Sequence, residues 1–336
     1  MTQAPPLRGG RQTTRVVVMR EPGPAEVLQV EQAELAAPGP REVRLRQVAV
    51  GVNYHDVYVR SGLYQTLPLP GVPGIEAVGI VEQVGAEVAH LSPGDRVGYV
   101  TGRYGAYAEA RNLDAALAVK LPAALSDVQA AASLMKAFTV AMLVGRVHRV
   151  ERGQTILVHA AAGGVGQLLC SWARSLGATV IGAVGSEEKA QIARAHGAEH
   201  VIFYRHEDVA ARVAEITGGE GVAAAYDSVG ADTFDGSVAA LGFEGHLVSY
   251  GQASGPAPPF AMSLLATRSL SVSRPIVFHY LRTPEMLHDI AKQAFDAFAH
   301  GVIQPIDPVV LPLDQAAEAH RLLEARRSPG GVVLAP

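Results

Sequence analysis

A glycine-rich turn between a predicted strand and a predicted helix constrains the fold of this chain more than any other feature. The segment TILVHA (155–160) is an apolar run typical of a buried strand, and a helical pattern begins at Gly164. The turn between them matches G-x-G-x-x-G, with Ala161 in the place of the first glycine and with Gly163 and Gly166 in the other two. Alanine is excluded there only where φ must be positive, so the turn still fits a dinucleotide-binding loop. The alternative is a turn that only packs a helix on a strand.

Strands and helices alternate in the part of the chain that follows this turn. Predicted strands lie at 155–160, 179–184, 200–204, 222–230, 246–251 and 270–275, and predicted helices begin at Gly164 and Ser186 and cover 209–218. Continuous apolar strands separated by helices are typical of a parallel sheet covered on both faces. The pattern predicts an α/β fold with a doubly wound parallel sheet of the Rossmann type.

The chain has a different pattern on either side of this unit. Residues 15–125 read as short strands separated by Gly, Pro and Asp turns, and EVRLRQVAV (42–50) alternates apolar and charged residues as a half-buried strand does. Elements predicted outside the α/β unit are a helix from the capping box Ser126–Gln129 to about Val147, a helix capped by Thr283, a helix over 314–327 and a last strand over 331–336. The layout is a β-rich region, an inserted α/β unit and a short α/β tail.

Composition and charge exclude several classes of function. Hydrophobic residues make up 49% of the 336 residues, and the formal charge is −4, which gives no reason to expect a nucleic acid or an anionic membrane as partner. Cys170 is the only cysteine, so we expect no intramolecular disulfide, no zinc site with several cysteines, and a cytoplasmic protein. The alanine-rich stretch 121–147 is interrupted by Asp127 and Lys136 and is not expected to span a membrane.

The segment GQTILVHAAAGGVGQLLCSWAR resembles the signature of the quinone oxidoreductase/zeta-crystallin family, a branch of the medium-chain dehydrogenase/reductase superfamily. One position departs from it, because Ser171 stands inside the helix where the family usually has glutamine. Other similar stretches are VNYHDVYVRSGLY (52–64), GIEAVGIVEQVG (74–85), GDRV (94–97), YDSVG (226–230) and SRP (273–275). The resemblance implies a GroES-like β-rich catalytic domain at 13–136 and 276–336 and a Rossmann NADPH-binding domain at 137–275. Pro5, Pro6, Gly9 and Gly10 predict a disordered tail at 1–12.

The end of the second predicted strand indicates which nicotinamide cofactor is bound. NAD-binding folds place an acid about 20 residues after the loop, but here Gly185 occupies that position and Ser186 follows it. In the family that this chain resembles, residues matching Lys189 and Tyr204 bind the 2′-phosphate, which implies NADPH. An alternative is that Lys189 is an ordinary solvated helix lysine. By resemblance, the cofactor groove comprises Asn53, Tyr58, Ala162, Gly163, Gly164, Val165, Gly185, Ser186, Lys189, Tyr204, Ser228, Tyr250, Gly251, Gln252, Ser273, Arg274 and Arg326.

The positions that bind catalytic zinc in related alcohol dehydrogenases hold no metal ligand here. Asn53 stands where those enzymes have a cysteine, and Ile75 where they have a histidine, so we expect no metal site. We interpret His55 as a packing residue of a helical turn. The resemblance places Asn53, Tyr58 and Tyr64 in the substrate cleft, although half-buried packing is an equal alternative for the two tyrosines. No proton donor is assigned.

The reaction that these features imply is zinc-independent hydride transfer from NADPH to a quinone or another small electron-poor acceptor. Two alternatives stay open, namely a reductase of alkenal or enone double bonds and a crystallin-like NADPH-binding protein with little turnover. We expect no nucleic acid or membrane partner. The apolar edge strand LSVSRP (270–275) predicts a homodimer through paired sheet edges, unless Arg268 and Arg274 protect that edge.

Overall fold

The computed structural model describes residues 12–325 and 330–336 of the chain. These residues form two compact units, one from 12–134 together with 307–325 and 330–336, and the other from Met135–Ile306. The predicted tail at 1–12 lies outside the described residues except for Gln12, which begins the first strand.

The first unit is built on a seven-stranded sheet around one long central strand. The strands of the whole unit are β1 (Gln12–Met19), β2 (Leu28–Leu35), β3 (Glu42–Val52), β4 (Glu76–Val84), β5 (Arg96–Val100), β6 (Ala110–Asp114), β7 (Val119–Lys120), β14 (Val309–Pro312) and β15 (Val332–Ala335). The sheet order is β14-β15-β3-β4-β5-β7, and β6 also pairs with β3, whereas β1 and β2 form a separate ribbon. Central β3 therefore pairs antiparallel with β4, β6 and the late strand β15.

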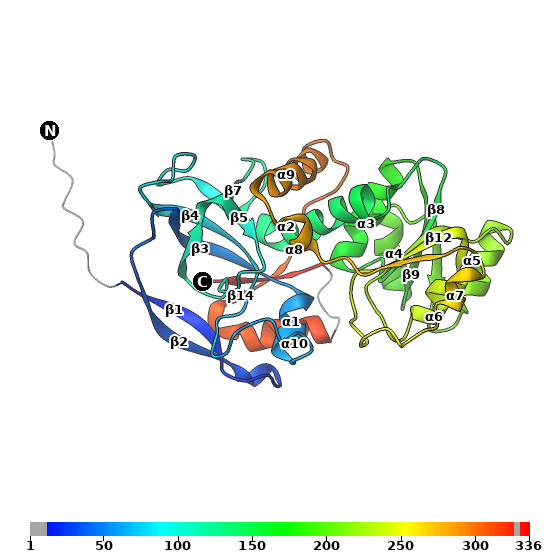
Figure 1. Ribbon diagram of the computed structural model, residues 1–336, viewed down its shortest axis with the longest axis horizontal. Coiled ribbons are helices and arrows are strands. Elements are labelled where there is room, and N and C mark those ends of the chain that lie inside the picture. The colour runs from blue at the N-terminus through cyan, green and yellow to red at the C-terminus, as the bar shows by residue number, and fades with distance from the viewer. Residues whose placement is uncertain (1–11, 326–329) are drawn as a thin grey trace. The chain divides into compact units, whose positions relative to one another are not determined.

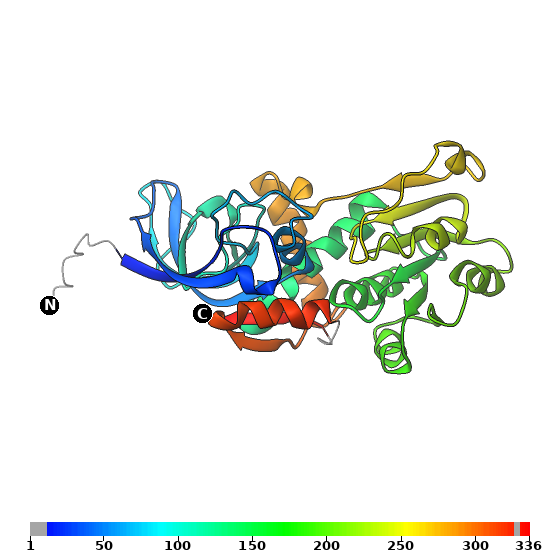
Figure 2. The same ribbon diagram turned by 90° about the horizontal axis from the view of Figure 1, so that it is seen from below.

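Short helices cover parts of this first unit. They are the 3-10 turns η1 (Ala25–Val27), η2 (Ala115–Leu117) and η4 (Leu313–Gln315), and the helices α1 (Tyr54–Arg60) and α10 (Ala316–Glu324). Figure 2 shows α10 running below the β1–β2 ribbon of this unit. The helix predicted over 314–327 is thus a 3-10 turn followed by a shorter α-helix in the described residues. Val43, Leu45, Tyr99 and Tyr107 are fully buried in the core.

The second unit confirms the predicted parallel sheet. Its strands are β8 (Thr155–His159), β9 (Thr179–Val184), β10 (His200–Phe203), β11 (Val222–Asp227), β12 (Leu241–Ser249) and β13 (Ser271–Ser273). All neighbours are parallel in the order β10-β9-β8-β11-β12-β13. In chain order this is 3-2-1-4-5-6, the doubly wound arrangement whose order reverses between β8 and β11. Ligands of such sheets bind at the carboxyl ends of the strands at this reversal.

Helices alternate with these strands, and the sequence predicts four of them but not the three short helices between residues 234 and 280. They are α3 (Gly164–Ser175), α4 (Glu187–Ala195), α5 (Val209–Thr217), α6 (Phe234–Ala239), α7 (Ser263–Ala266), α8 (Val277–Tyr280) and α9 (Pro284–Ala299). Figure 1 labels α3, α4, α5 and α6 around β8, β9 and β12. The caps follow the sequence too, because the Ser186 and Thr283 hydroxyls accept backbone N–H groups at the starts of α4 and α9.

The helix predicted from Ser126 to about Val147 has two parts. The α-helix α2 covers Asp127–Met142, and a π-helical turn, η3, covers Leu143–Val147. Ser126 Oγ accepts the backbone N–H of Gln129, as expected for a capping residue. Asp127–Val147 is long and apolar enough to cross a membrane, yet 78% of its most apolar window is buried inside the protein. That burial is the pattern of a core helix.

The compact units divide the chain later than the predicted boundary at residue 275. Residues 276–306, which the resemblance assigns to the catalytic domain, fall within the second unit. The reason is the packing of α9, because the rings of Phe138 and Phe295 lie 6.4 Å apart. Arg146 Nη2 also lies 2.5 Å from Asp289 Oδ2, which joins the π-helical turn to α9.

Candidate active site

The glycine-rich loop of the second unit has its left-handed residue one position earlier than the motif predicts. Ala160 has φ of 50°, whereas Ala161 is not among the residues with positive φ. The Ala161 side chain is fully buried, and a Cβ added at Gly182 on β9 would lie 2.9 Å from the Ala161 Cβ. Ala161 therefore fits the first position because a glycine on the neighbouring strand leaves room for its methyl group.

The other two glycines of the motif are required by close backbone contacts. Gly163 precedes α3, and its N–H donates to the Ala160 carbonyl at 2.8 Å. A Cβ at Gly166 would lie 2.3 Å from the same carbonyl oxygen, so only glycine fits there. The loop thus directs the amino end of a twelve-residue helix to the carboxyl edge of β8. Free N–H groups and the helix dipole make such an end suitable for a pyrophosphate.

The structure brings Gly185 and Tyr204 together at the ends of β9 and β10. A Cβ at Gly185 would lie 2.6 Å from Tyr204 Oη and 3.3 Å from Arg205 Nε. Ser186 and Lys189 lie at the adjacent start of α4, where Ser186 Oγ accepts the Lys189 N–H at 3.4 Å. Four predicted residues therefore gather in one place. Sequence reasoning missed Arg205, although its position directly after Tyr204 was the available signal.

Two acids beside this cluster, Glu187 and Glu207, are engaged elsewhere. Glu187 Oε1 pairs with Arg194 at 2.9 Å, and the Glu207 carboxylate pairs with Arg212 and accepts a backbone N–H. No acid in the described part of the chain forms an ion pair with Lys189 or Arg205. The cluster therefore contributes two cations, Lys189 and Arg205, and Glu187 and Glu207 pair with other arginines.

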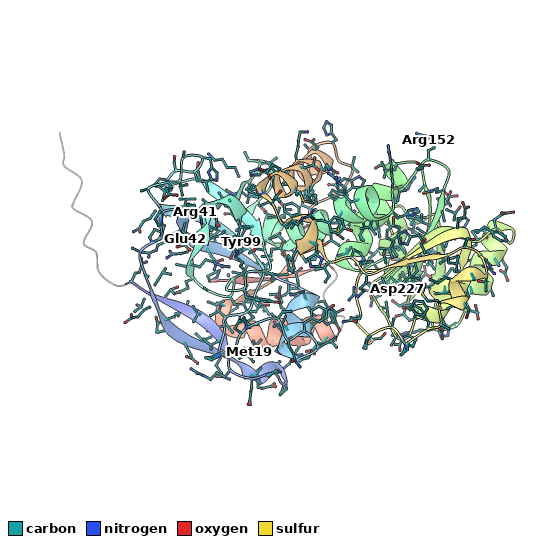
Figure 3. The ribbon with its side chains drawn as sticks, in the orientation of Figure 1. Met19, Arg41, Glu42, Tyr99, Arg152 and Asp227 are labelled. Atoms are coloured by element: carbon teal, nitrogen blue, oxygen red, sulfur yellow. The ribbon has the colours of Figure 1, made fainter. Side chains whose placement is uncertain are left out.

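A buried carboxylate at the end of β11 accepts hydrogen bonds from the loop that follows this strand. Asp227, labelled in Figure 3, accepts the backbone N–H groups of Val229 (2.7 Å) and Gly230 (3.1 Å) on Oδ1. Its Oδ2 accepts the hydroxyl of Thr233 at 2.7 Å. Asp227 is only 2% exposed. This carboxylate fixes the backbone of the loop that contains Ser228.

A second set of contacts extends this network to the strand before the glycine-rich loop. Ser237 Oγ donates to Asp227 Oδ2 at 2.8 Å and lies 2.9 Å from His159 Nε2. Because the single hydroxyl proton goes to the carboxylate, His159 donates its Nε2–H to Ser237. Burial lowers the pKa of His159, and the Asp227 charge opposes that shift only in part. His159 is thus neutral, and β8 and β11 are joined at the sheet reversal.

The remaining predicted cofactor residues follow β12 and β13. A Cβ at Gly251 would lie 2.5 Å from the Ser228 carbonyl oxygen, so the loops after β11 and β12 are in close contact. Ser273 Oγ lies 2.8 Å from His246 Nε2, and Arg274 Nη1 donates to the Ser249 carbonyl at 2.9 Å. Tyr250 and Gln252 belong to the same loop as Gly251. Arg326 lies outside the described residues.

In the first unit, Asn53 is oriented by a buried carboxylate. Asn53 Nδ2 donates to Glu76 Oε2 at 2.7 Å, and the Asn53 backbone N–H donates to Asp56 Oδ2 at 2.8 Å in a capping box. Glu76 and Ile75 are fully buried. The positions matching zinc ligands are thus occupied by an amide–carboxylate hydrogen bond and an apolar side chain. The described residues contain no group of three or more His, Cys, Asp or Glu side chains arranged to hold a metal ion.

Below α1 lies a buried cluster of titratable groups that the sequence did not indicate. Tyr107 Oη lies 3.3 Å from Asp56 Oδ2 and 3.0 Å from His320 Nε2, and Arg60 forms an ion pair with Glu324. Burial, with a smaller contribution from the Arg60 charge, lowers the pKa of His320 to about 3. The cluster fixes α1 against α10, although their residues are far apart in the sequence.

The candidate acceptor residues Tyr58 and Tyr64 belong to an aromatic cluster on α1 and the loop after it. Their ring centroids lie 5.0 Å apart, and the His55 ring meets Tyr64 edge-on at 5.5 Å. His55 also stacks on Tyr104 at 5.9 Å. Tyr58 is 9% exposed, so it packs as a nearly buried side chain. Sequence reasoning missed Tyr104, which lies 40 residues beyond Tyr64 and matches no motif.

Comparisons with known proteins agree with this architecture. The alcohol dehydrogenase GroES-like domain family matches residues 39–123, and the zinc-binding dehydrogenase family matches residues 164–292. The quinone oxidoreductase of Pseudomonas aeruginosa is 45% identical over 318 residues, covering 94% of this chain and 97% of that protein. A 2-haloacrylate reductase of a Burkholderia species is 40% identical over 313 residues, covering 91% and 94%.

Solved structures give the same result. The Escherichia coli quinone oxidoreductase complexed with NADPH has a TM-score of 0.92 at 41% identity, covering 97% of this chain and 100% of that one. A GroES-like unit joined to a Rossmann unit defines an oxidoreductase of the medium-chain dehydrogenase/reductase class. Within that class, the chain belongs to the quinone oxidoreductase family.

Proposed function

We propose that this protein is an NADPH-dependent quinone reductase that transfers hydride without zinc. The observation that supports it most directly is the acid-free end of β9, where Gly185, Ser186, Lys189 and Tyr204 meet beside Arg205. A carboxylate at Gly185 would repel a 2′-phosphate, whereas these donors and cations attract one. The Escherichia coli relative with NADPH supports the same cofactor.

The residues of the two units have separate roles in this proposal. The loop of Ala162, Gly163, Gly164 and Val165 binds the pyrophosphate, and Ser228, Tyr250, Gly251, Gln252, Ser273 and Arg274 line the rest of the cofactor groove. Arg326 remains a prediction from the resemblance. Asn53, Tyr58 and Tyr64 supply the surface for the quinone and the nicotinamide. Bound NADPH supplies the hydride, and these side chains orient the acceptor and exclude water.

Steady-state NADPH oxidation with a panel of quinones tests the proposal. We expect turnover with quinones, and we expect it to persist after chelation of metal, because Asn53 bonds to Glu76 where zinc enzymes have a ligand. Activity that chelation abolishes and zinc restores would contradict zinc independence. Flat traces with every acceptor, despite tight NADPH binding, would favour a binding protein with little turnover.

A second candidate function is reduction of an activated carbon–carbon double bond. The observation in its favour is the 2-haloacrylate reductase, which is 40% identical over nearly the full chain. Enones, alkenals and 2-haloacrylates therefore belong in the same panel. A kcat/KM for one of them above that of every quinone would make double-bond reduction the main activity.

The proposal includes a homodimer formed through β13, which lies at one edge of the second unit's sheet. Two apolar side chains of this unit are strongly exposed, Phe243 (81% exposed) on β12, the strand next to β13, and Met262 (75%) just before α7. A second copy pairing along β13 would continue the sheet. Light scattering should give a dimer mass, and Val272→Pro should give a folded monomer while Val272→Thr stays dimeric. A monomeric unaltered protein would contradict this part.

The proposed location is the cytoplasm, where thiols remain reduced. Cys170 is fully buried, and burial raises the pKa of its thiol to about 12. A free thiol in this state is compatible with a reducing compartment.

A further inference from the structure

Three side chains from separate parts of the first unit form a hydrogen-bonded chain beside Tyr64. His55 Nε2 lies 3.0 Å from Tyr104 Oη, and Tyr104 Oη is also within hydrogen-bond distance of Thr66 Oγ1. His55 lies on α1, Thr66 lies in the loop after α1 two residues beyond Tyr64, and Tyr104 follows β5. Thr66 is exposed, whereas Tyr104 and His55 are progressively less accessible. The chain therefore extends from solvent to the ring of Tyr64.

Counting protons shows what such a chain can do. A neutral histidine, a tyrosine and a threonine carry one exchangeable proton each, and two hydrogen bonds join the three groups. An arrangement in which both bonds run in the same direction leaves one further donor at an end of the chain. Reversing the direction of both bonds moves that donor from Thr66 to His55. The three groups can thus pass a proton along the chain, and each stays neutral because it gains one proton as it gives up another.

His55 is in the state that such transfer requires. Burial lowers the pKa of His55 to about 4, so its ring is neutral at physiological pH. A neutral ring accepts a proton at one nitrogen while it releases the proton on the other. Burial also raises the pKa of Tyr104, while the Thr66 hydrogen bond lowers it and the Asp56 and Tyr64 charges raise it. Tyr104 accordingly remains a hydroxyl that both accepts and donates.

We propose that Thr66, Tyr104 and His55 form a relay that delivers the proton consumed in quinone reduction to the acceptor beside Tyr64. The inference rests on the proposed function. Two-electron reduction of a quinone adds one hydride, which yields the hydroquinone monoanion and the oxidised nicotinamide. The monoanion oxygen then takes one proton from the His55 ring, which recovers it from Tyr104, and Thr66 replaces the Tyr104 proton from water. Atoms and charges balance with one hydride and one solvent proton per turnover.

Tyr104→Phe is the central test, because it keeps the ring stacked on His55 and removes only the hydroxyl. We expect kcat for an ordinary quinone to fall about tenfold or more, since positioned proton transfer contributes about 10²–10⁴-fold. KM should change little, and the solvent deuterium isotope effect on kcat should rise as protonation becomes limiting. The loss should shrink for chlorinated quinones, whose hydroquinone anions are weaker bases and need a proton less.

Thr66 provides the matched pair of control variants. Thr66→Val removes the hydroxyl at nearly constant shape, and we expect the same direction of change in kcat and isotope effect. Thr66→Ser keeps the hydroxyl and should retain most of the activity. Unchanged kcat and isotope effect in Tyr104→Phe and Thr66→Val would overturn the relay alone. Absence of quinone turnover in the unaltered protein would overturn the proposed function and the relay with it.

Discussion

The phosphate-side cluster of the second unit and the aromatic cluster of the first unit are built by different means. The first comprises the turn at 160–166 and the cluster of Gly185, Ser186, Lys189, Tyr204 and Arg205, and it relies on small residues, backbone groups and two cations. The second uses buried rings and side chains from α1, two loops and, beneath them, α10. Recognition of a phosphate needs close backbone approach, whereas recognition of an acceptor needs shaped side-chain surfaces. Different mutations disrupt the two clusters, so the contribution of each cluster can be measured separately.

The largest expected effect comes from adding one methyl group to the glycine-rich turn. In Gly166→Ala the new Cβ would lie 2.3 Å from the Ala160 carbonyl oxygen, a backbone atom that cannot move aside cheaply. We expect a loss of about 1–3 kcal/mol in the free energy of unfolding, as for other overpacked sites. NADPH binding should be lost as well. Thermal denaturation and calorimetry measure the two effects.

Gly236→Ala is the matched control for that variant. Gly236 also lies in a helix, α6, but a Cβ there would meet nothing within 4 Å. Replacing it should stabilise by about 0.5–1 kcal/mol, because alanine is the better helix former. Equal effects at both glycines would show that the turn's close packing has no special importance.

The next effect concerns the cations of the phosphate-side cluster. Lys189→Ala and Arg205→Ala should each weaken NADPH binding about tenfold, close to the lower limit for a charge-assisted hydrogen bond. NADH affinity should stay near its original value, because NADH lacks the 2′-phosphate. Calorimetry with both cofactors measures this, starting from an unaltered protein that binds NADPH at least tenfold more tightly. A parallel loss for NADH would instead indicate damage to the fold.

A smaller effect tests the buried cluster beneath the aromatic rings through its dependence on pH. His320 has a pKa of about 3 in the folded protein, and the ordinary value for histidine is about 6.5. Below about pH 6.5 the unfolded chain binds a proton that the folded protein refuses, so stability falls as the pH falls. As the pH falls from 7.5 to 5.5, this group should lower the free energy of unfolding by about 1 kcal/mol.

His320→Gln should flatten that acid limb of the stability curve. Melting temperatures recorded across this pH range measure the slope, which is independent of any constant loss from the missing ring. The exposed His279→Gln serves as control and should leave the slope unchanged. An unaltered slope in His320→Gln would contradict a histidine that is kept neutral by burial.

The contrast between the two clusters also explains what the sequence predicts. The parallel sheet and the glycine-rich turn were predicted correctly, because contiguous periodicity and fixed spacing determine them. The family resemblance assigned Gly185 and Tyr204 to one site, and the two residues are in contact. Tyr104, Glu76 and His320 were not, because their roles arise from contacts between segments far apart in the chain. His55 was interpreted as a packing residue, and only its distance to Tyr104 shows a hydrogen-bonding role.

The position of β15 has a consequence for the order in which the protein matures on the ribosome. β15 lies between β14 and β3 in the sheet of the first unit, so that sheet stays open until residues 332–335 have been synthesised. The second unit draws all six of its strands from one uninterrupted stretch and can be complete earlier. The nascent chain therefore carries an unfinished sheet in its first unit while its second unit is already folded. The exposed edges of β3 and β14 are the places where a chaperone would be needed.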